Sequence, residues 1–321
     1  MSSGVSEPRV RRALVTGISG QDGHYLAGQL IDDGIEVFGL TRSDAPVAAG
    51  VQALRGDLRD ASSLRRAIDA CRPDQIYNLA AATFVPGSWE NPGEVEDVNG
   101  GGVERLIDAI RACGLPIRLC HASSAEIFGP PSGKPQDEHT ELAPASPYAR
   151  GKARAHRAIA AAREEHGLFA CSAILFNHES PRRPTRFVTR KIAMAVARIH
   201  RGLGDHVTLG SLEASRDWGY APEYVAAMRD MLAAPQPADY VVATGRSATV
   251  ADFARLAFAS VGLEWRRHIR FDASLARPGD SLARIGDPSR IAKDLGWRAT
   301  TSLEDLVRIM VDADLVLLDK W

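Results

Sequence analysis

Tyr148 and Lys152 lie four residues apart at the start of a helical pattern, so we expect both side chains to face the same way. A free tyrosine has a pKa of about 10 and is a poor base at neutral pH. A neighbouring ammonium group stabilises the phenolate and lowers that pKa, which makes the tyrosine a usable acid and base. The pair therefore predicts a site at which a substrate hydroxyl gives up its proton.

Ser124 and Glu126 follow an apolar run that ends near residue 122. A serine at a strand end, beside a Tyr/Lys pair, is able to hydrogen-bond a hydroxyl that is being oxidised, so Ser124, Tyr148 and Lys152 together predict hydride transfer. Glu126 adds a second acid/base group, which the removal of water across carbons 5 and 6 of a sugar requires. Because some related reductases also carry a glutamate here, dehydration and reduction both stay open.

Three glycines, Gly17, Gly20 and Gly23, follow a predicted strand and open a predicted helix. Glycines placed in this way let backbone N–H groups approach a pyrophosphate, and the helix N-terminus adds partial positive charge. We therefore predict a dinucleotide site that includes these glycines together with Gln21 and Asp22.

The end of the second predicted strand, where a ribose 2′ group would lie, carries Thr41, Arg42 and Ser43 and no immediate carboxylate. An arginine at this point favours a 2′-phosphate, whereas a carboxylate binds a free 2′-hydroxyl. Arg42 therefore favours NADP as the cofactor. Asp44 lies close enough to keep NAD possible.

Short β-like runs alternate with helical patterns along the first half of the chain. Strands are predicted at 13–16, 36–40, 75–79, 118–120 and 171–176, and helices at 61–71, 98–112 and 149–165. This alternation is typical of a parallel sheet covered by helices on both faces. We expect a doubly wound α/β (Rossmann) fold, with 11–176 as the NADP-binding domain and a later strand near 240–245 returning to the sheet.

The pattern loosens after about residue 177, where Pro, Arg and Gly become frequent. Helices are predicted at 250–261, 288–295 and 303–318. We expect residues 177–321 to form mainly a smaller lobe that binds the substrate.

The 321 residues carry a formal net charge of −1, which does not suggest the basic face that nucleic-acid binding requires. The four cysteines have neither CxxC nor metal-ligand spacing, so we predict no disulfide framework and no metal site. Residues 1–10 do not read as a signal peptide, and no stretch approaches the roughly 20 apolar residues of a membrane helix. We expect a cytoplasmic protein that binds neither nucleic acid nor membrane.

Three stretches in the second half are more discriminating than any glycine motif: 177–183 (Asn-His-Glu-Ser-Pro-Arg-Arg), 187–192 and 215–219 (Ser-Arg-Asp-Trp-Gly). Together with the residues above, they make the chain similar to the GDP-mannose 4,6-dehydratases of the extended short-chain dehydrogenase/reductase family. The resemblance covers nearly the whole chain. It implies an NADP-dependent hydro-lyase that acts on a nucleotide sugar.

The resemblance also implies roles for individual residues. Ser124, Glu126, Tyr148 and Lys152 fall on the family's catalytic positions, with a serine where the family has a threonine. The residues implied for binding the nucleotide sugar are Asn177, Glu179, Lys191, Arg216 and Arg277. The residues implied for the cofactor, beyond the glycine turn and Arg42, are Asp57, Leu58, Leu79, Tyr148 and Lys152.

The sequence departs from the family at several points. The loop after the second strand, which in the family helps to hold NADP and touches a neighbouring subunit, is cut to 42–54. Phe128 replaces a tyrosine, 82–84 (Ala-Thr-Phe) replaces Gln-Ser-His, and Asp280 stands where a glutamate is usual. Because these changes surround the sugar and base pockets, the sugar is left open. The segments 98–112 and 149–165 resemble helices that pair subunits, which favours a homodimer, with a homotetramer as the alternative.

Three functional hypotheses follow. The first is a nucleotide-sugar 4,6-dehydratase that forms the 4-keto-6-deoxy sugar of GDP-mannose or a related GDP-sugar. The alternative keeps Ser124, Tyr148 and Lys152 but omits water loss, which gives a GDP-sugar 4-epimerase or 4-ketoreductase. The third, a catalytically silent NADP-binding regulator, has no need of the proton-transfer residues, so their presence argues against it.

Overall fold

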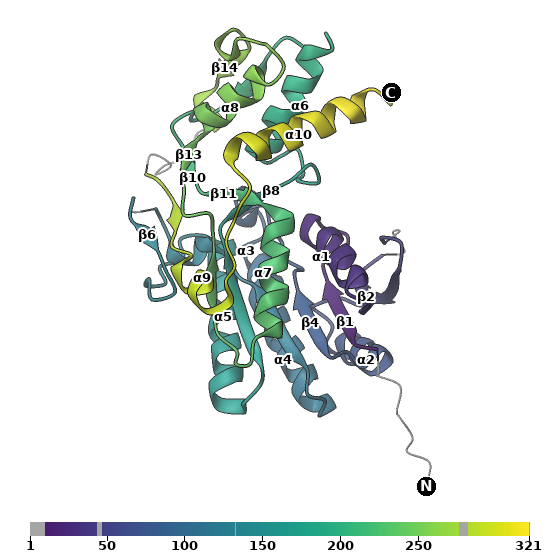
Figure 1. Cartoon of the computed structure of the whole chain (residues 1–321). Coiled ribbons are helices and arrows are strands. Elements are labelled where there is room, and N and C mark those ends of the chain that lie inside the picture. Colours follow the sequence, from purple (N-terminus) through teal and green to yellow (C-terminus); the bar gives the residue numbers. More distant parts are fainter. Residues whose placement is uncertain (1–9, 44–46, 132, 276–281, 321) are drawn as a thin grey trace.

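Seven parallel strands form the central sheet, in the order β3-β2-β1-β4-β5-β7-β12 (Figure 1). Their bounds are β1 (Arg12–Thr16), β2 (Glu36–Thr41), β3 (Val51–Arg55), β4 (Gln75–Asn78), β5 (Arg118–Ala122), β7 (Ala170–Leu175) and β12 (Tyr240–Val242). The computed structural model describes residues 10–43, 47–131, 133–275 and 282–320. The strand order runs outward from β1 and then restarts at β4, which confirms the predicted doubly wound fold and places the ligand crevice between β1 and β4.

β3 is not among the predicted strands, since all of it but Arg55 falls in the segment 42–54, which is expected as a shortened loop. It pairs with β2 at the edge of the sheet, and none of its five residues is buried. An edge strand without buried residues has no apolar run to reveal it, which is why the sequence pattern misses it.

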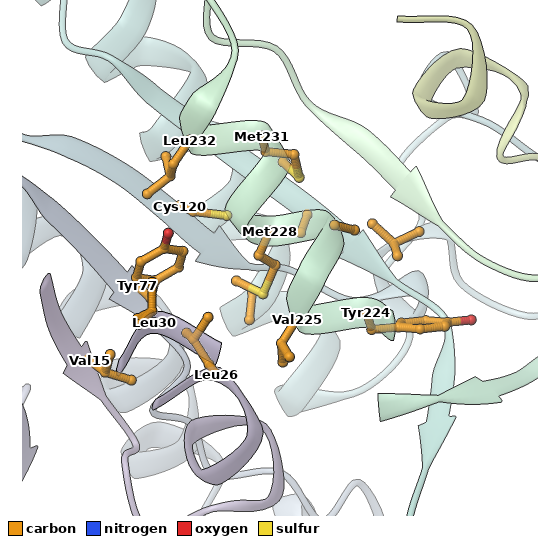
Figure 2. Packing of buried hydrophobic residues seen from close by; sticks show 14 of the residues in the cluster. Val15, Leu26, Leu30, Tyr77, Cys120, Tyr224, Val225, Met228, Met231 and Leu232 are labelled. Atoms are coloured by element: carbon orange, nitrogen blue, oxygen red, sulfur yellow. The ribbon is translucent and has the colours of Figure 1, made fainter. Parts of the chain in front are cut away.

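Helices α1 (Gln21–Asp32), α7 (Ala221–Ala233) and α9 (Ser289–Leu295) pack on one face of the sheet. Figure 2 shows side chains from α1 and α7, including Leu26, Leu30 and Met228, gathered with Tyr77 of β4 in a single buried cluster. Because α1 follows the glycine turn directly, this core fixes the position of the turn relative to the sheet.

Helices α2 (Ala61–Cys71), α4 (Gly102–Cys113) and α5 (Pro147–His166) cover the opposite face. Leu106 of α4 and Ile159 of α5 are fully buried there against strand residues such as Leu119 of β5. The predicted helix at 98–112 differs at its start, where a π-helical turn (Asp97–Gly101) precedes α4. Within that turn the Asn99 amide accepts a hydrogen bond from Ala82 N (2.8 Å) and donates one to Ala82 O (3.2 Å).

A second lobe lies beyond the sheet, at the top of Figure 1, around helices α6 (Val188–His200), α8 (Val250–Ala259) and α10 (Leu303–Leu318). These helices share their own core, in which Ile192, Phe253 and Met310 are fully buried. A buried ion pair between Arg190 of α6 and Asp314 of α10 ties two of them together. After residue 176 the chain therefore alternates between this lobe and the sheet domain. It returns to that domain at α7 and β12 and again at α9, with α7 and α9 packed on the sheet and β12 at its edge.

Short elements complete the described chain. They are α3 (Pro92–Glu96), β6 (Pro135–Gln136), β8 (Asn177–Glu179), β9 (Val207–Leu209), β10 (Ser215–Arg216), β11 (Trp218–Tyr220), β13 (Ala248–Thr249), β14 (Ile269–Phe271), β15 (Ile285–Gly286) and the single 3₁₀ turns η1 (Pro86–Trp89), η3 (Ala125–Phe128), η4 (Trp265–Arg267) and η5 (Ala273–Leu275). No helix among the described residues has both the length and the apolar character to cross a membrane.

Two glycines of α1 give a matched test of the packing behind the glycine turn. At Gly23 an added Cβ would lie 2.5 Å from Gly17 O and 2.6 Å from Ile18 Cα, whereas at the exposed Gly28 it would meet nothing within 4 Å. We expect Gly23→Ala to lower the free energy of unfolding by about 1–3 kcal/mol, because backbone atoms must move apart.

Gly28→Ala is the control and should raise it by about 0.5–1 kcal/mol, because alanine loses less backbone entropy in a helix. Urea denaturation of both variants measures the two changes. Equal effects in the two variants would contradict the close approach at Gly23.

Candidate active site

The turn after β1 touches the loop after β4 backbone to backbone. Gly17 adopts φ +70°, and a Cβ there would lie 2.8 Å from Ala80 N. Beside it, Ala80 N donates to Thr16 Oγ1 (3.1 Å), which in turn donates to Asn78 Oδ1 (2.7 Å). Gly20, the N-cap of α1, offers no side-chain cap, so the first N–H groups of the helix are available to an anion. The turn thus has the close-packed glycines and open helix end that suit a dinucleotide pyrophosphate.

Gln21 and Asp22, both predicted to bind the cofactor, use their side chains to hold the segment that starts with β8. Gln21 Nε2 donates to His178 O (3.1 Å), Gln21 Oε1 accepts from Ser180 Oγ (2.7 Å), and Asp22 Oδ2 lies 3.0 Å from His178 Nε2. Burial by itself would raise the pKa of Asp22, but His178 and Gln21 outweigh it and bring that pKa down to about 2. Because both side chains are engaged in this way, we expect Gln21 and Asp22 to contact a cofactor mainly through their backbone N–H groups.

The other predicted cofactor residues follow the carboxyl ends of β2, β3 and β4. Arg42 is exposed just after β2, and its charge contributes to a lowered pKa of Asp57, which is due first to a hydrogen bond from Arg59. Leu58 is buried, and Leu79, directly after β4, is half-buried. Asp44 lies outside the described residues.

The four predicted catalytic residues come from two neighbouring segments. Ser124, two residues after β5, caps η3 by accepting from Glu126 N (3.3 Å). Tyr148 and Lys152 occupy the first two turns of α5, which Ser146 caps. The Tyr148 phenol lies near enough to Ser124 and Glu126 for both side chains to influence its pKa. The structure therefore brings the phenol, the hydroxyl and the carboxylate into one neighbourhood.

The electrostatics of this group differ from the expectation that Lys152 activates the tyrosine. Burial raises the pKa of Tyr148 to about 12, while Ser124 and Arg183 act in the opposite direction. Burial also lowers the pKa of Lys152 to about 8, and its Nζ donates to Ala122 O (2.6 Å). Without a ligand, desolvation thus outweighs the nearby cations, and the phenol needs a further positive charge before it is a strong proton acceptor.

Glu179, predicted to bind the nucleotide sugar, is instead 1% exposed. Its Oε2 accepts from Thr189 Oγ1 (2.6 Å) and lies 3.2 Å from Arg183 Nε. The Arg183 guanidinium is stacked 3.9 Å from the centre of the Phe187 ring. Glu179 is therefore buried against Thr189 and Arg183, and its contact with the nucleotide sugar stays a prediction.

Two of the remaining predicted substrate residues, Lys191 and Arg216, lie in α6 and β10. Lys191 of α6 lines a cavity of about 410 Å³ that Thr185, Arg198 and Thr208 also border. Arg216, in β10, is half-buried and donates to Ser215 O (2.8 Å). Asn177, also half-buried, begins β8 and pairs in register with Trp218 of β11. Arg277, with Pro278 and Asp280, lies outside the described residues.

Sequence reasoning missed two residues beside this site, His178 and Arg183, although both lie in the discriminating stretch 177–183. His178 packs against Tyr224 of α7 (ring centres 4.9 Å apart) while bound to Asp22. Their types gave a signal, since an imidazole and a guanidinium beside Asn177 are able to bind anions. Among the described residues, no group of three His, Cys, Asp or Glu side chains is placed to hold a metal ion.

Comparison with protein families gives a match to the model described as "GDP-mannose 4,6 dehydratase" over residues 14–310. Among curated relatives, the chain is 45% identical to "GDP-mannose 4,6 dehydratase 1" of Arabidopsis thaliana, over 98% of this chain and 92% of that protein. It is 37% identical to "GDP-mannose 4,6 dehydratase" of Homo sapiens, over 95% and 92% respectively.

Solved structures agree at the level of the fold. A UDP-glucose 4-epimerase of Thermus thermophilus in complex with NAD is 28% identical, with a TM-score of 0.83 over 94% of this chain and 98% of that chain. RMD from Pseudomonas aeruginosa, complexed with NADPH, is 23% identical, with a TM-score of 0.83 over 96% and 100%.

Lys152 offers a test of the buried charge. Its pKa is lowered from 10.5 to about 8, which corresponds to a penalty of about 3 kcal/mol for burying the ammonium. We expect Lys152→Met to raise the free energy of unfolding at neutral pH by about 2 kcal/mol, after the lost bond to Ala122 O is allowed for, and to abolish turnover.

The sign of the pH dependence is fixed by the same shift. The free-energy cost of burying the Lys152 ammonium is present in full below about pH 8, where the folded and unfolded chains both carry the proton. It falls as the folded chain loses the proton and is gone above pH 10.5, where the unfolded chain has lost it as well. The excess in free energy of unfolding of Lys152→Met over the wild type, measured by chemical denaturation, should therefore shrink between these pH values. An advantage that grows with pH would contradict the assignment.

Proposed function

The chain belongs to the GDP-mannose 4,6-dehydratase family and is a nucleotide-sugar 4,6-dehydratase, a hydro-lyase, and we propose that its substrate is GDP-mannose or a related GDP-sugar. The proposal rests on full-length similarity to relatives that carry this name. The single structural observation behind it is that Glu126 lies in the turn capped by Ser124, near enough to Tyr148 for its charge to act on the phenol. An epimerase or reductase needs no second acid/base group at that place.

The cofactor is a nicotinamide dinucleotide, since similar structures hold NADPH or NAD. Of these two we propose NADP, because Arg42 stands just after β2, where a 2′-phosphate would lie. The backbone of Gly17, Gly20 and Gly23 and the open start of α1 would hold the pyrophosphate.

The first step removes the proton of the carbon-4 hydroxyl. Ser124 orients that hydroxyl and Tyr148 accepts its proton, while Lys152 holds the end of β5 through Ala122 O. A bound nicotinamide would supply a hydride acceptor for carbon 4, a hydride donor for carbon 6 and, in its oxidised form, a positive charge. That charge would offset the burial that raises the pKa of Tyr148.

Water loss follows at carbons 5 and 6. The carbon-4 ketone acidifies the carbon-5 hydrogen, which the Glu126 carboxylate removes as a proton. The same proton then goes to the carbon-6 hydroxyl, which leaves as water. Tyr148 finally returns its proton to carbon 5, so the protein ends each turnover in its starting protonation state and no cofactor is consumed.

The nucleotide half of the substrate would lie in the lobe. Lys191 faces the cavity between α6 and β9, and Arg216 lies in β10 of the same lobe. Lysine and arginine are suited to a diphosphate, the first as a mobile charge and the second as a rigid fork.

A homodimer paired through α4 and α5 and a cytoplasmic location complete the proposal. The outer side of α5 carries Arg150 and Arg154, which pair with Glu96 and Glu104 at 2.7 and 2.5 Å. The described cysteines are all free thiols, as suits a reducing compartment. Sedimentation equilibrium of the purified protein distinguishes the dimer from a tetramer.

Glu126→Gln separates the two halves of the reaction. The amide is unable to take the carbon-5 proton, so we expect oxidation at carbon 4 to continue while dehydration falls by about 10²- to 10⁴-fold. Reduced nicotinamide should then accumulate, which absorbance detects, and mass spectrometry should find little 4-keto-6-deoxy product. Tyr148→Phe is the control, because it should block both halves. Dehydration at a near-normal rate in Glu126→Gln would refute the role of Glu126.

Arg42→Ala tests the choice of cofactor. Loss of a charge-assisted contact to the 2′-phosphate should weaken NADP⁺ binding by about 10- to 100-fold and leave NAD⁺ within about twofold. Calorimetric titration of cofactor-free protein measures both affinities. Arg66→Ala, an exposed arginine on α2 paired with Asp60, serves as the control. Equal losses for the two dinucleotides would rule out a 2′-phosphate contact at Arg42.

A further inference from the structure

Arg284, which lies just before β15, is a buried cation in contact with the turn that carries Glu126. It is 4% exposed. Its Nη1 donates to Ala125 O (2.8 Å) and its Nη2 donates to Gly129 O (2.9 Å), so the guanidinium bridges both ends of η3. The same Nη2 lies 3.6 Å from Glu126 Oε2.

The backbone of Arg284 is held as firmly as its side chain. Arg284 N donates to Ser215 O (3.4 Å), and Arg284 O accepts from Asp217 N (3.0 Å). The fully buried Asp217 carboxylate in turn accepts hydrogen bonds from Thr244 N (2.9 Å) and Gly286 N (3.3 Å). The guanidinium is therefore a fixed group, set by the same strand ends that carry Arg216.

Burying a guanidinium costs free energy unless its donors and its charge are matched. Ala125 O, Gly129 O and the Glu126 carboxylate help to offset this cost, so the burial of Arg284 depends on the shape of the turn. The carboxylate is partly accessible to solvent: the Glu126 side chain is 31% exposed, compared with 5% for the side chain of Arg284. The cation thus lies behind the carboxylate and acts on the substrate only through it.

We propose that Arg284 is a positioning residue for Glu126, which it holds by one oxygen while the other faces the sugar. This inference rests on the proposed role of Glu126 in water loss. Engaging Oε2 from behind leaves Oε1 to take the carbon-5 proton and deliver it to the carbon-6 hydroxyl. The bridge from Ala125 O to Gly129 O keeps the turn, and so the distance from Oε1 to the substrate, constant. Proton transfer is sensitive to such placement, and an error of about 1 Å can cost a factor of 100.

The test compares Arg284→Met and Arg284→Lys with the wild type and Glu126→Gln. Methionine fills similar space without charge, and lysine restores the charge but is unable to bridge both carbonyls. For Arg284→Met we expect dehydration of GDP-mannose to slow by about 10- to 100-fold, KM to stay within about twofold, and reduced nicotinamide to accumulate. Arg284→Lys should recover part of the rate.

Arg118→Met is the matched control for loss of stability. Arg118 begins β5, at the opposite end of the strand from the site, and its Nη1 also donates to two carbonyls, Leu232 O (2.7 Å) and Ala234 O (2.8 Å). We expect Arg118→Met and Arg284→Met both to lower Tm, but reduced nicotinamide should not accumulate in Arg118→Met. Should Arg284→Met fail to fold, Arg284→Lys carries the comparison.

The outcomes separate the two ideas. If the wild type dehydrates the substrate and Glu126→Gln stops it, then unchanged dehydration in the Arg284 variants overturns the positioning role alone. An Arg284 variant whose carbon-4 oxidation falls as much as its dehydration, with no reduced nicotinamide building up, also overturns it. A wild type that forms no 4-keto-6-deoxy sugar overturns the proposed function, and the role of Arg284 with it.

Discussion

Where the turn after β1 passes the loop after β4, backbone lies against backbone: a single added Cβ at Gly17 would come within 2.8 Å of Ala80 N. This approach is possible because the strand order reverses between β1 and β4, so that the following helices leave in opposite directions. The site is built around it. The start of α1 is left open on one side, and on the other the ends of β4 and β5 carry the loops that lead to Asn99 and Ser124.

Burial, more than any one charge, governs the chemistry beside that contact. It raises the pKa of Tyr148 and lowers that of Lys152, so both groups disfavour their charged forms until a ligand changes their surroundings. Asp22 behaves differently, because His178 and Gln21 outweigh the effect of burial and lower its pKa to about 2. The site thus combines a phenol and an amine whose charged forms burial disfavours with a carboxylate that stays ionised. Such an arrangement suits a reaction in which protons are borrowed and returned.

The sequence predicts the parts of this molecule whose signals are local. The glycine turn is visible because its residues adjoin in the chain, and Tyr148 and Lys152 because a helix puts them one turn apart. Contacts across the fold leave no such trace. Arg284 bonds Ala125 O from 159 positions away, and the buried contacts of Glu179 with Arg183 and Thr189 do not follow from its residue type. α7 is not among the predicted helices, although its buried residues, such as Tyr224, Val225 and Met228, follow the helical period and a proline occupies its first turn, where helices favour it.

The ion pair between Arg190 and Asp314 has a consequence for the far end of the chain. Arg190 also donates through Nε to Pro181 O (2.9 Å), within the segment that joins β8 to α6. Burial raises the pKa of Asp314 to about 6 despite the guanidinium beside it, so this brace carries a charge that mild acid removes. Through Arg190, the last helix, α10, is therefore tied to the segment that joins β8 to α6. Removing the chain from residue 314 onward would delete Asp314 and leave the buried Arg190 guanidinium without this carboxylate.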